Sequence, residues 1–127
     1  MTIRPLHPFL LAAGFAPIFS IIVQPVVHAQ ETWVAIADDG GSNFGYAVGM
    51  ATREAAEITA LGECGSGCAL KLTAPARCVA YARSDAGNAS GYGAGPTLDT
   101  VRDQAWQQCN RRVPSNSCTV RAARCFE

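Results

Sequence analysis

The sequence predicts an α+β fold, a single small domain made of two pseudo-repeated ββαβ units that share a sheet. Two observations support this prediction. Residues 34–78 and 79–125 resemble each other, and each segment contains three cysteines. A lone ββαβ unit would also leave one sheet face bare, so two units are expected to share one core. The clearest matched segments are Val34-Ala35-Ile36-Ala37 with Val79-Ala80-Tyr81-Ala82, and Gly45-Tyr46 with Gly91-Tyr92.

The first unit is predicted to begin with a β-hairpin and a helix. Trp33–Ala37 and Phe44–Met50 are the expected strands, because apolar residues dominate both and a cluster of Asp, Gly, Ser and Asn separates them. Thr52 is the expected N-cap of a helix that runs to about Glu63, because its hydroxyl can accept a hydrogen bond from an otherwise unpaired N–H. Apolar residues then alternate over Ala69–Leu72, which predicts a third strand.

The second unit repeats this order. Its predicted elements are a strand at Val79–Arg83, a turn at Asp85–Ser90, a return strand at Gly91–Gly95, a helix capped by Thr97 or Thr100, and a closing strand at Cys118–Cys125.

Each predicted helix has one apolar stripe that should face the core. Residues at positions i, i+4 and i+8 share a helix face, which groups Ala56, Ala60 and Cys64 in the first unit and Val101, Ala105 and Cys109 in the second. Both tryptophans, Trp33 and Trp106, are expected to fill the core, since large aromatic side chains contribute most when buried.

Residues 1–29 resemble a secretory signal peptide. Arg4 precedes an apolar run over Phe9–Val23, and Val27-His28-Ala29 supplies the small or apolar residues expected before a cleavage site. The alternative, a retained membrane anchor, is disfavoured because the run is shorter than the ~20 residues of a spanning helix. Cleavage after Ala29 would leave residues 30–127 as one exported domain without membrane insertion, either secreted or periplasmic.

Six cysteines in such a short exported chain predict disulfide bonds rather than a metal site. Cys64 and Cys68 flank one helix-to-strand turn, and Cys109 and Cys118 flank the matching, longer turn. We therefore expect these two local bridges. A third bridge, Cys78 to Cys125, would join the equivalent ends of the two units.

Composition disfavours several functional classes. Residues 30–127 carry nine Lys and Arg against ten Asp and Glu, a net charge of −1, and no basic run is interleaved with aromatic residues, so nucleic acid is not an expected partner. The only histidines are His7 and His28, both inside the predicted signal peptide. Histidine-dependent catalysis is therefore not expected, and no metal or cofactor is predicted.

A few local motifs keep other chemistry open. Asp38 and Asp39 could serve a carboxylate-dependent hydrolase or, with the rest of the turn 38–43, hold calcium, although turn residues in solvent are the simpler interpretation. Glu54 and Glu57 fit the positive end of the helix dipole. The glycine-rich segment Gly91–Gly95 lacks the Lys-Ser/Thr of a phosphate loop and is expected to be a close-packed strand.

Five residues are candidates for binding a partner. Arg111 and Arg112 lie in a loop that only the second unit extends, and loops on rigid scaffolds often carry function. Phe44, Tyr46 and Tyr92 lie beside turns, and aromatic and arginine side chains dominate binding hot spots.

Several segments of the chain together match the pattern of a known family. They are Trp33-Val34-Ala35-Ile36-Ala37, Gly45-Tyr46-Ala47-Val48-Gly49, Thr52-Arg53-Glu54-Ala55-Ala56, Cys64, Cys68, Cys78, Gly91-Tyr92-Gly93 and Cys109. Through these residues the chain resembles a family of small exported bacterial proteins catalogued as domain of unknown function 4189. The resemblance implies export, a compact disulfide-bonded domain and bacterial origin, and it supplies no catalytic residues. The second helix departs from the family pattern at residues 98–102.

These observations predict an exported, non-enzymatic protein that binds another protein, such as an inhibitor or an immunity-type factor. A small rigid disulfide scaffold without histidine in its exported part motivates this prediction. The alternative is a small carboxylate-dependent hydrolase that acts on cell-wall or glycan substrates, which would require two carboxylates ~5–10 Å apart in a cleft.

Overall fold

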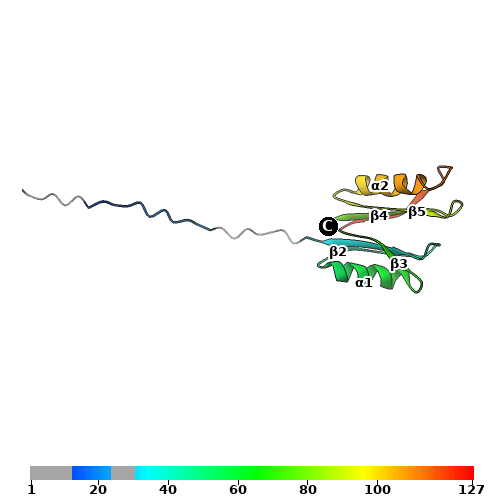
Figure 1. Cartoon of the computed structure of the whole chain (residues 1–127), viewed down its shortest axis with the longest axis horizontal. Helices are drawn as coiled ribbons and strands as arrows, with labels where there is room; N and C mark the ends of the chain where they lie inside the picture. Colours follow the sequence, from blue (N-terminus) through cyan, green and yellow to red (C-terminus); the bar gives the residue numbers. More distant parts are fainter. Residues whose placement is uncertain (1–12, 24–30) are drawn as a thin grey trace, which may run out of the picture.

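The computed structural model describes residues 13–23 and 31–127. Residues 13–23 form no helix or strand, and their side chains are exposed. The predicted cleavage site after Ala29 lies outside the described residues. Residues 31–127 form four layers, in which two sheets pack face to face and one helix covers the outer face of each sheet (Figure 1).

The first unit contains the four predicted elements. They are β1 (Trp33–Asp38), β2 (Phe44–Met50), α1 (Arg53–Cys64) and β3 (Ala69–Pro75). The Thr52 hydroxyl caps α1 by accepting the Ala55 N–H at 3.1 Å, as predicted. Gly65 ends the helix with a φ of 99°, a conformation that glycine adopts without steric cost.

The second unit repeats these elements as β4 (Cys78–Ser84), β5 (Ala89–Gly95), α2 (Leu98–Asn110) and β6 (Thr119–Cys125). Of the two candidate caps, Thr97 is the N-cap, and its hydroxyl accepts the Thr100 N–H at 3.3 Å. The α+β class and the two ββαβ units are therefore confirmed.

The two units do not share one sheet, which corrects that detail of the prediction. The first sheet has the order β2-β1-β3 and the second has the order β5-β4-β6, with antiparallel pairing throughout. The reason is that the last strand of each unit pairs with the first strand of its own unit. Each helix therefore covers one face of its own sheet, and the units meet through the opposite faces.

The layer between the sheets is the shared core. Val34 and Ile36 of β1 pack against Val79 and Tyr81 of β4, and all four side chains are buried. β2 lies next to β6 and β3 next to β5 on either side of this centre. The sandwich consequently has two long sides, one bordered by β2 and β6 and the other by β3 and β5.

Small residues allow each helix to approach its sheet closely. A Cβ at Gly91 would collide with the main-chain oxygen of Ala105 in α2, and a Cβ at Gly45 would collide with that of Ala60 in α1. The buried stripes of the helices are the predicted ones, Ala56, Ala60 and Cys64 in α1 and Val101, Ala105 and Cys109 in α2. The prediction of a close-packed glycine strand in the second unit is confirmed.

All three predicted disulfide bonds are present, Cys64–Cys68, Cys109–Cys118 and Cys78–Cys125. The reason given for the third bridge is wrong, however. Cys78 begins β4 and lies directly opposite Cys125 at the end of β6, so the bridge closes the second unit on itself. The corresponding pair in the first unit is Trp33 opposite Pro75.

The expectation that Trp106 fills the core is also wrong. Its side chain is 41% exposed, because α2 turns the stripe of Val101, Ala105 and Cys109 toward the sheet and Trp106 lies beside that stripe. Trp33 is half-buried and packs against the core of the first unit, with the guanidinium of Arg53 5.4 Å from its ring centre.

Candidate functional site

The structure divides the five predicted binding residues between the two long sides of the sandwich. Phe44 and Tyr46 belong to β2 and line a hollow on the side bordered by β2 and β6. Tyr92, Arg111 and Arg112 line hollows on the side bordered by β3 and β5. The five residues therefore do not form one surface.

The larger of these hollows lies between β2 and β6 and has a volume of about 390 Å³. We call it the β2–β6 groove. It combines two aromatic side chains with three arginines, and its lining contains no carboxylate. Its residues are Phe44, Tyr46, Arg102, Val120, Arg121, Ala122, Ala123 and Arg124.

The aromatic side of the groove is held by the core between the sheets. The ring of Phe44 lies 4.4 Å from the ring of buried Tyr81, measured between centroids, and Tyr46 packs against the same cluster. Both side chains stay half-buried, so each presents part of its ring at the surface. Rigid, partly exposed aromatic rings lose little conformational entropy when a partner covers them.

The basic side of the groove comes from residues that sequence reasoning missed. Arg121 and Arg124 lie on β6, and Arg102 lies on α2. Arg121 pairs with Asp85 at 2.9 Å. In residues 31–127, neither Arg102 nor Arg124 makes a salt bridge, so both guanidinium groups are available to a carboxylate. Arginines among small residues in the closing strand were the sequence signal that could have indicated this surface.

A second hollow, of about 280 Å³, lies near the turns on the opposite side. It is lined by residues from both units, so it marks where the two halves of the domain meet. These residues are Asp38, Gly40, Lys71, Arg83, Asn88, Ala89, Ser90, Tyr92 and Arg112.

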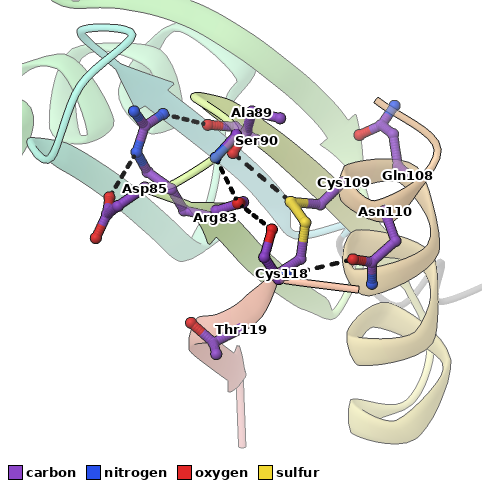
Figure 2. Close-up of a disulfide and its surroundings, with 12 residues drawn as sticks. Arg83, Asp85, Ala89, Ser90, Gln108, Cys109, Asn110, Cys118 and Thr119 are labelled. Atoms are coloured by element: carbon purple, nitrogen blue, oxygen red, sulfur yellow. Dashed lines mark hydrogen bonds and ion pairs between the residues drawn. A yellow bond between two sulfur atoms is a disulfide. The ribbon is translucent and has the colours of Figure 1, made fainter. Parts of the chain in front are cut away.

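The buried guanidinium group of Arg83 lies at this second hollow and donates hydrogen bonds to residues of both units. Arg83 is only 5% exposed, and each of its three guanidinium nitrogens donates to a neighbouring acceptor. Figure 2 shows this side chain beside Asp85 and Ser90. The acceptors are Asp85 Oδ1 at 3.2 Å, Ser90 Oγ at 3.0 Å, Gly40 O at 3.2 Å and Asn88 Oδ1 at 2.8 Å. The bond to Gly40 ties the two units together.

A second hydrogen bond between the units joins Tyr92 to Asp38. The Tyr92 hydroxyl donates to Asp38 Oδ2 at 2.6 Å, and Lys71 Nζ lies 3.9 Å from Asp38 Oδ1. Burial, together with the hydrogen bond to Asp38 and the charge of that carboxylate, raises the pKa of Tyr92 well above its ordinary value. The Asp38 carboxylate thus has partners within the domain, which favours a structural role for it.

Asp39 is held by the turn that follows it. Its Oδ1 accepts the Gly41 N–H at 2.7 Å and the Asn43 N–H at 3.2 Å, and its Oδ2 accepts from the Asn43 side chain at 2.9 Å. The hydrogen bonds from Gly41 and then Asn43 hold the pKa of Asp39 below its ordinary value. This carboxylate stabilises the hairpin turn in the way that Asp commonly does.

The extended loop of the second unit carries Arg111 and Arg112 in exposed positions. The Cys109–Cys118 disulfide closes its base, and Asn110 Oδ1 accepts the Cys118 N–H at 3.2 Å (Figure 2). Val113 is buried and anchors the middle of the loop. Arg111 lines a hollow with Gln104, Gln107, Gln108 and Tyr92, whereas Arg112 lines the hollow around Arg83.

The model of one protein family matches residues 33–125, a range that runs from the start of β1 to the end of β6. The chain belongs to the DUF4189 family. The family's own description is a domain of unknown function, so membership in DUF4189 establishes kinship and leaves the activity open. Neither a curated protein nor a solved structure matches the chain.

Two features bear on where this DUF4189 domain works. Its three disulfide bonds indicate an oxidising compartment outside the cytoplasm. None of the helices in the described residues has the length and apolar character needed to cross a membrane.

Proposed function

We propose that this domain is an exported, non-enzymatic binding protein that recognises an acidic surface of another protein. The observation that carries the proposal is the β2–β6 groove, where half-buried aromatic rings lie beside three arginines. Arginine and aromatic side chains are enriched in binding hot spots. An inhibitor or an immunity-type factor would use such a surface in the periplasm or outside the cell, once the chain has been cleaved after Ala29.

Charge complementarity selects an acidic partner. Arg102 and Arg124 make no ion pair within residues 31–127, and burial of such cations beneath a partner is favourable only if carboxylates meet them. The planar guanidinium group also matches the geometry of a carboxylate.

The alternative, a carboxylate-dependent hydrolase, has less support. Asp38 is the single carboxylate in the lining of the hollow around Arg83, and it is bonded to Tyr92. Asp39 is engaged by its own turn. A pair of carboxylates flanking a cleft, which glycoside hydrolysis needs, is not formed by these two aspartates.

Reversing the charge of the groove should weaken binding without unfolding the domain. The variant Arg102→Glu with Arg124→Glu is expected to capture its partner from the native envelope about tenfold more weakly or worse, because acidic groups would then face like charges. Thermal unfolding should change little, since both arginines are exposed. Quantitative mass spectrometry of captured proteins, against wild type at equal concentration, measures the effect.

The matched comparison is Arg111→Ala with Arg112→Ala, which removes two exposed arginines on the opposite side of the sandwich. This variant tests the predicted loop surface at little cost in stability. Loss of the same partner only in the groove variant assigns binding to the groove. Loss only in the loop variant would move the binding surface to the loop and contradict the groove assignment.

A further inference from the structure

The helices make different contacts with the two equivalent edge strands, β2 and β5. α2 supplies side-chain acceptors to the edge of β5, and within residues 31–127 α1 does not do so at β2. At β5, the side chains of Gln108 and Gln104 reach over the sheet edge from α2. Gln108 Oε1 accepts the Tyr92 N–H at 2.6 Å, and Gln104 Oε1 accepts the Ala94 N–H at 3.1 Å. These bonds occupy the outward donors of Tyr92 and Ala94, which would otherwise be free to pair with another strand.

The outward donors of β2 follow from the register of its hairpin. The Asp39 N–H donates to Asn43 O, so that pair is a hydrogen-bonded one. Hydrogen-bonded and non-hydrogen-bonded pairs alternate along an antiparallel ladder. The pairs formed by Phe44 with Asp38 and by Tyr46 with Ile36 are therefore non-hydrogen-bonded, and the N–H groups of Phe44 and Tyr46 point away from β1.

The outward N–H of Tyr46 is not capped in the way that the N–H of Tyr92, its counterpart on β5, is capped. The residues of α1 that correspond to Gln104 and Gln108 are Thr59 and Glu63. The Thr59 hydroxyl bonds to the sulfur of Met50 instead. Within residues 31–127, no hydrogen bond outside the β1–β2 ladder uses the N–H of Phe44 or Tyr46. The edge of β2 is thus open at Tyr46, whereas Gln108 closes the edge of β5 at the equivalent residue, Tyr92.

This open edge borders the β2–β6 groove. The side chains of Phe44 and Tyr46 point into the layer between the sheets, toward β6. A strand added along β2 would extend the first sheet at the side bordered by β6, and those of its side chains that point toward the second sheet would approach Arg121 and Arg124. Addition of a strand to a free edge is a recurring mode of peptide recognition, in which main-chain bonds give affinity and side chains give specificity.

We propose that an extended acidic segment of the partner pairs with β2 as an additional strand and places its carboxylates over the arginines of the groove. This inference rests on the proposed function and specifies how the groove recognises its partner. It requires three features that occur together at this place, namely two outward N–H groups, two half-buried aromatic rings and the guanidinium groups of Arg102 and Arg124, which make no salt bridge within residues 31–127.

The test uses a synthetic peptide of alternating glutamate and threonine, as long as β2, which has seven residues. NMR of the isotopically labelled domain follows the amide signals of Phe44 and Tyr46 and their hydrogen exchange. The expected result is that the peptide shifts both signals and slows their exchange. The amide of Tyr92, already bonded to Gln108, should change little. A peptide in which lysine replaces glutamate should have no effect, because it would face the arginines with like charge.

Two variants at one position separate the main-chain bond from the side chain. Tyr46→Val keeps the N–H and removes the ring, whereas Tyr46→Pro removes both. Proline is tolerated on an edge strand when its position faces outward. We expect Tyr46→Pro to bind the acidic peptide about tenfold more weakly than Tyr46→Val, since it lacks one main-chain bond. The pair Phe44→Pro and Phe44→Val, at the first residue of β2, repeats the comparison if the first proline variant does not fold.

Equal peptide affinity in the proline and valine variants would overturn strand addition. So would peptide binding that leaves the amides of Phe44 and Tyr46 exchanging as fast as before, or no binding of the acidic peptide by the wild-type domain. A different result would contradict the proposed function. That result is capture of the same partner by the groove variant, Arg102→Glu with Arg124→Glu, as strongly as by the wild type. A failure of the binding mode is therefore distinguishable from a failure of the function.

Discussion

Replacing Cys78 and Cys125 together by alanine should lower the free energy of unfolding by about 4 kcal/mol. The bridge spans a sequence separation of 47 residues, and a cross-link that closes a loop of this length removes that much conformational free energy from the unfolded chain. Both cysteines lie at the ends of paired strands, so the native contacts of β4 and β6 should persist. Guanidinium-induced unfolding of the oxidised protein measures the change.

The matched control is the pair Cys64→Ala and Cys68→Ala. That bridge spans a separation of only four residues, and the same loop-closure argument gives a loss of about 2 kcal/mol. A loss for the short bridge that equals or exceeds the loss for Cys78–Cys125 would contradict this explanation of how the disulfides stabilise the domain.

Substituting Gly91 by alanine should destabilise the domain by about 3 kcal/mol, because the added methyl group overpacks the contact between α2 and its sheet. The new Cβ would collide with main-chain atoms of α2, at Ala105 O and Cys109 N. Main-chain atoms of a helix cannot rotate away as a flexible side chain can, so the whole helix has to move. Thermal and denaturant unfolding of the variant should both report this loss.

Gly62→Ala is the control for this substitution. Gly62 lies within α1, is exposed, and a Cβ there has no neighbour within 4 Å. Alanine is the better helix former, so this variant should gain roughly 0.5–1 kcal/mol. If Gly91→Ala were as stable as the wild type, the close approach of helix and sheet would not be needed for the fold.

Much of the fold could be predicted from the sequence, because it is encoded in local patterns. The strand at Phe44–Met50 has the predicted bounds, and the cap at Thr52 is confirmed. The number of sheets is not a local property, since it depends on which strand each closing strand joins. The alignment of Cys78 with Cys125 treats Cys78 as the last residue of the first unit, whereas it is the first residue of β4 in the second unit. The boundary between the two units falls at this residue, so the alignment does not show to which unit Cys78 belongs.

The candidate site was predictable only in part. Phe44 and Tyr46 were identified as binding candidates, and both line the groove. Arg102 and Arg124 could not be identified in this way, because their side chains come near β2 only when the two sheets pack face to face. The length of their loop distinguishes Arg111 and Arg112 in the sequence, and the structure places them on the other side of the sandwich.

Position-specific photo-cross-linking tests the central claim, that the β2–β6 groove binds another protein. A photo-reactive phenylalanine analogue at position 46 keeps an aromatic ring in the groove, and the same analogue at position 58 lies on α1, where Ile58 is 71% exposed. In the native envelope, we expect one protein to be cross-linked from position 46 through a segment rich in Asp and Glu, and none from position 58. No specific product at position 46, or the same products from both positions, would contradict it.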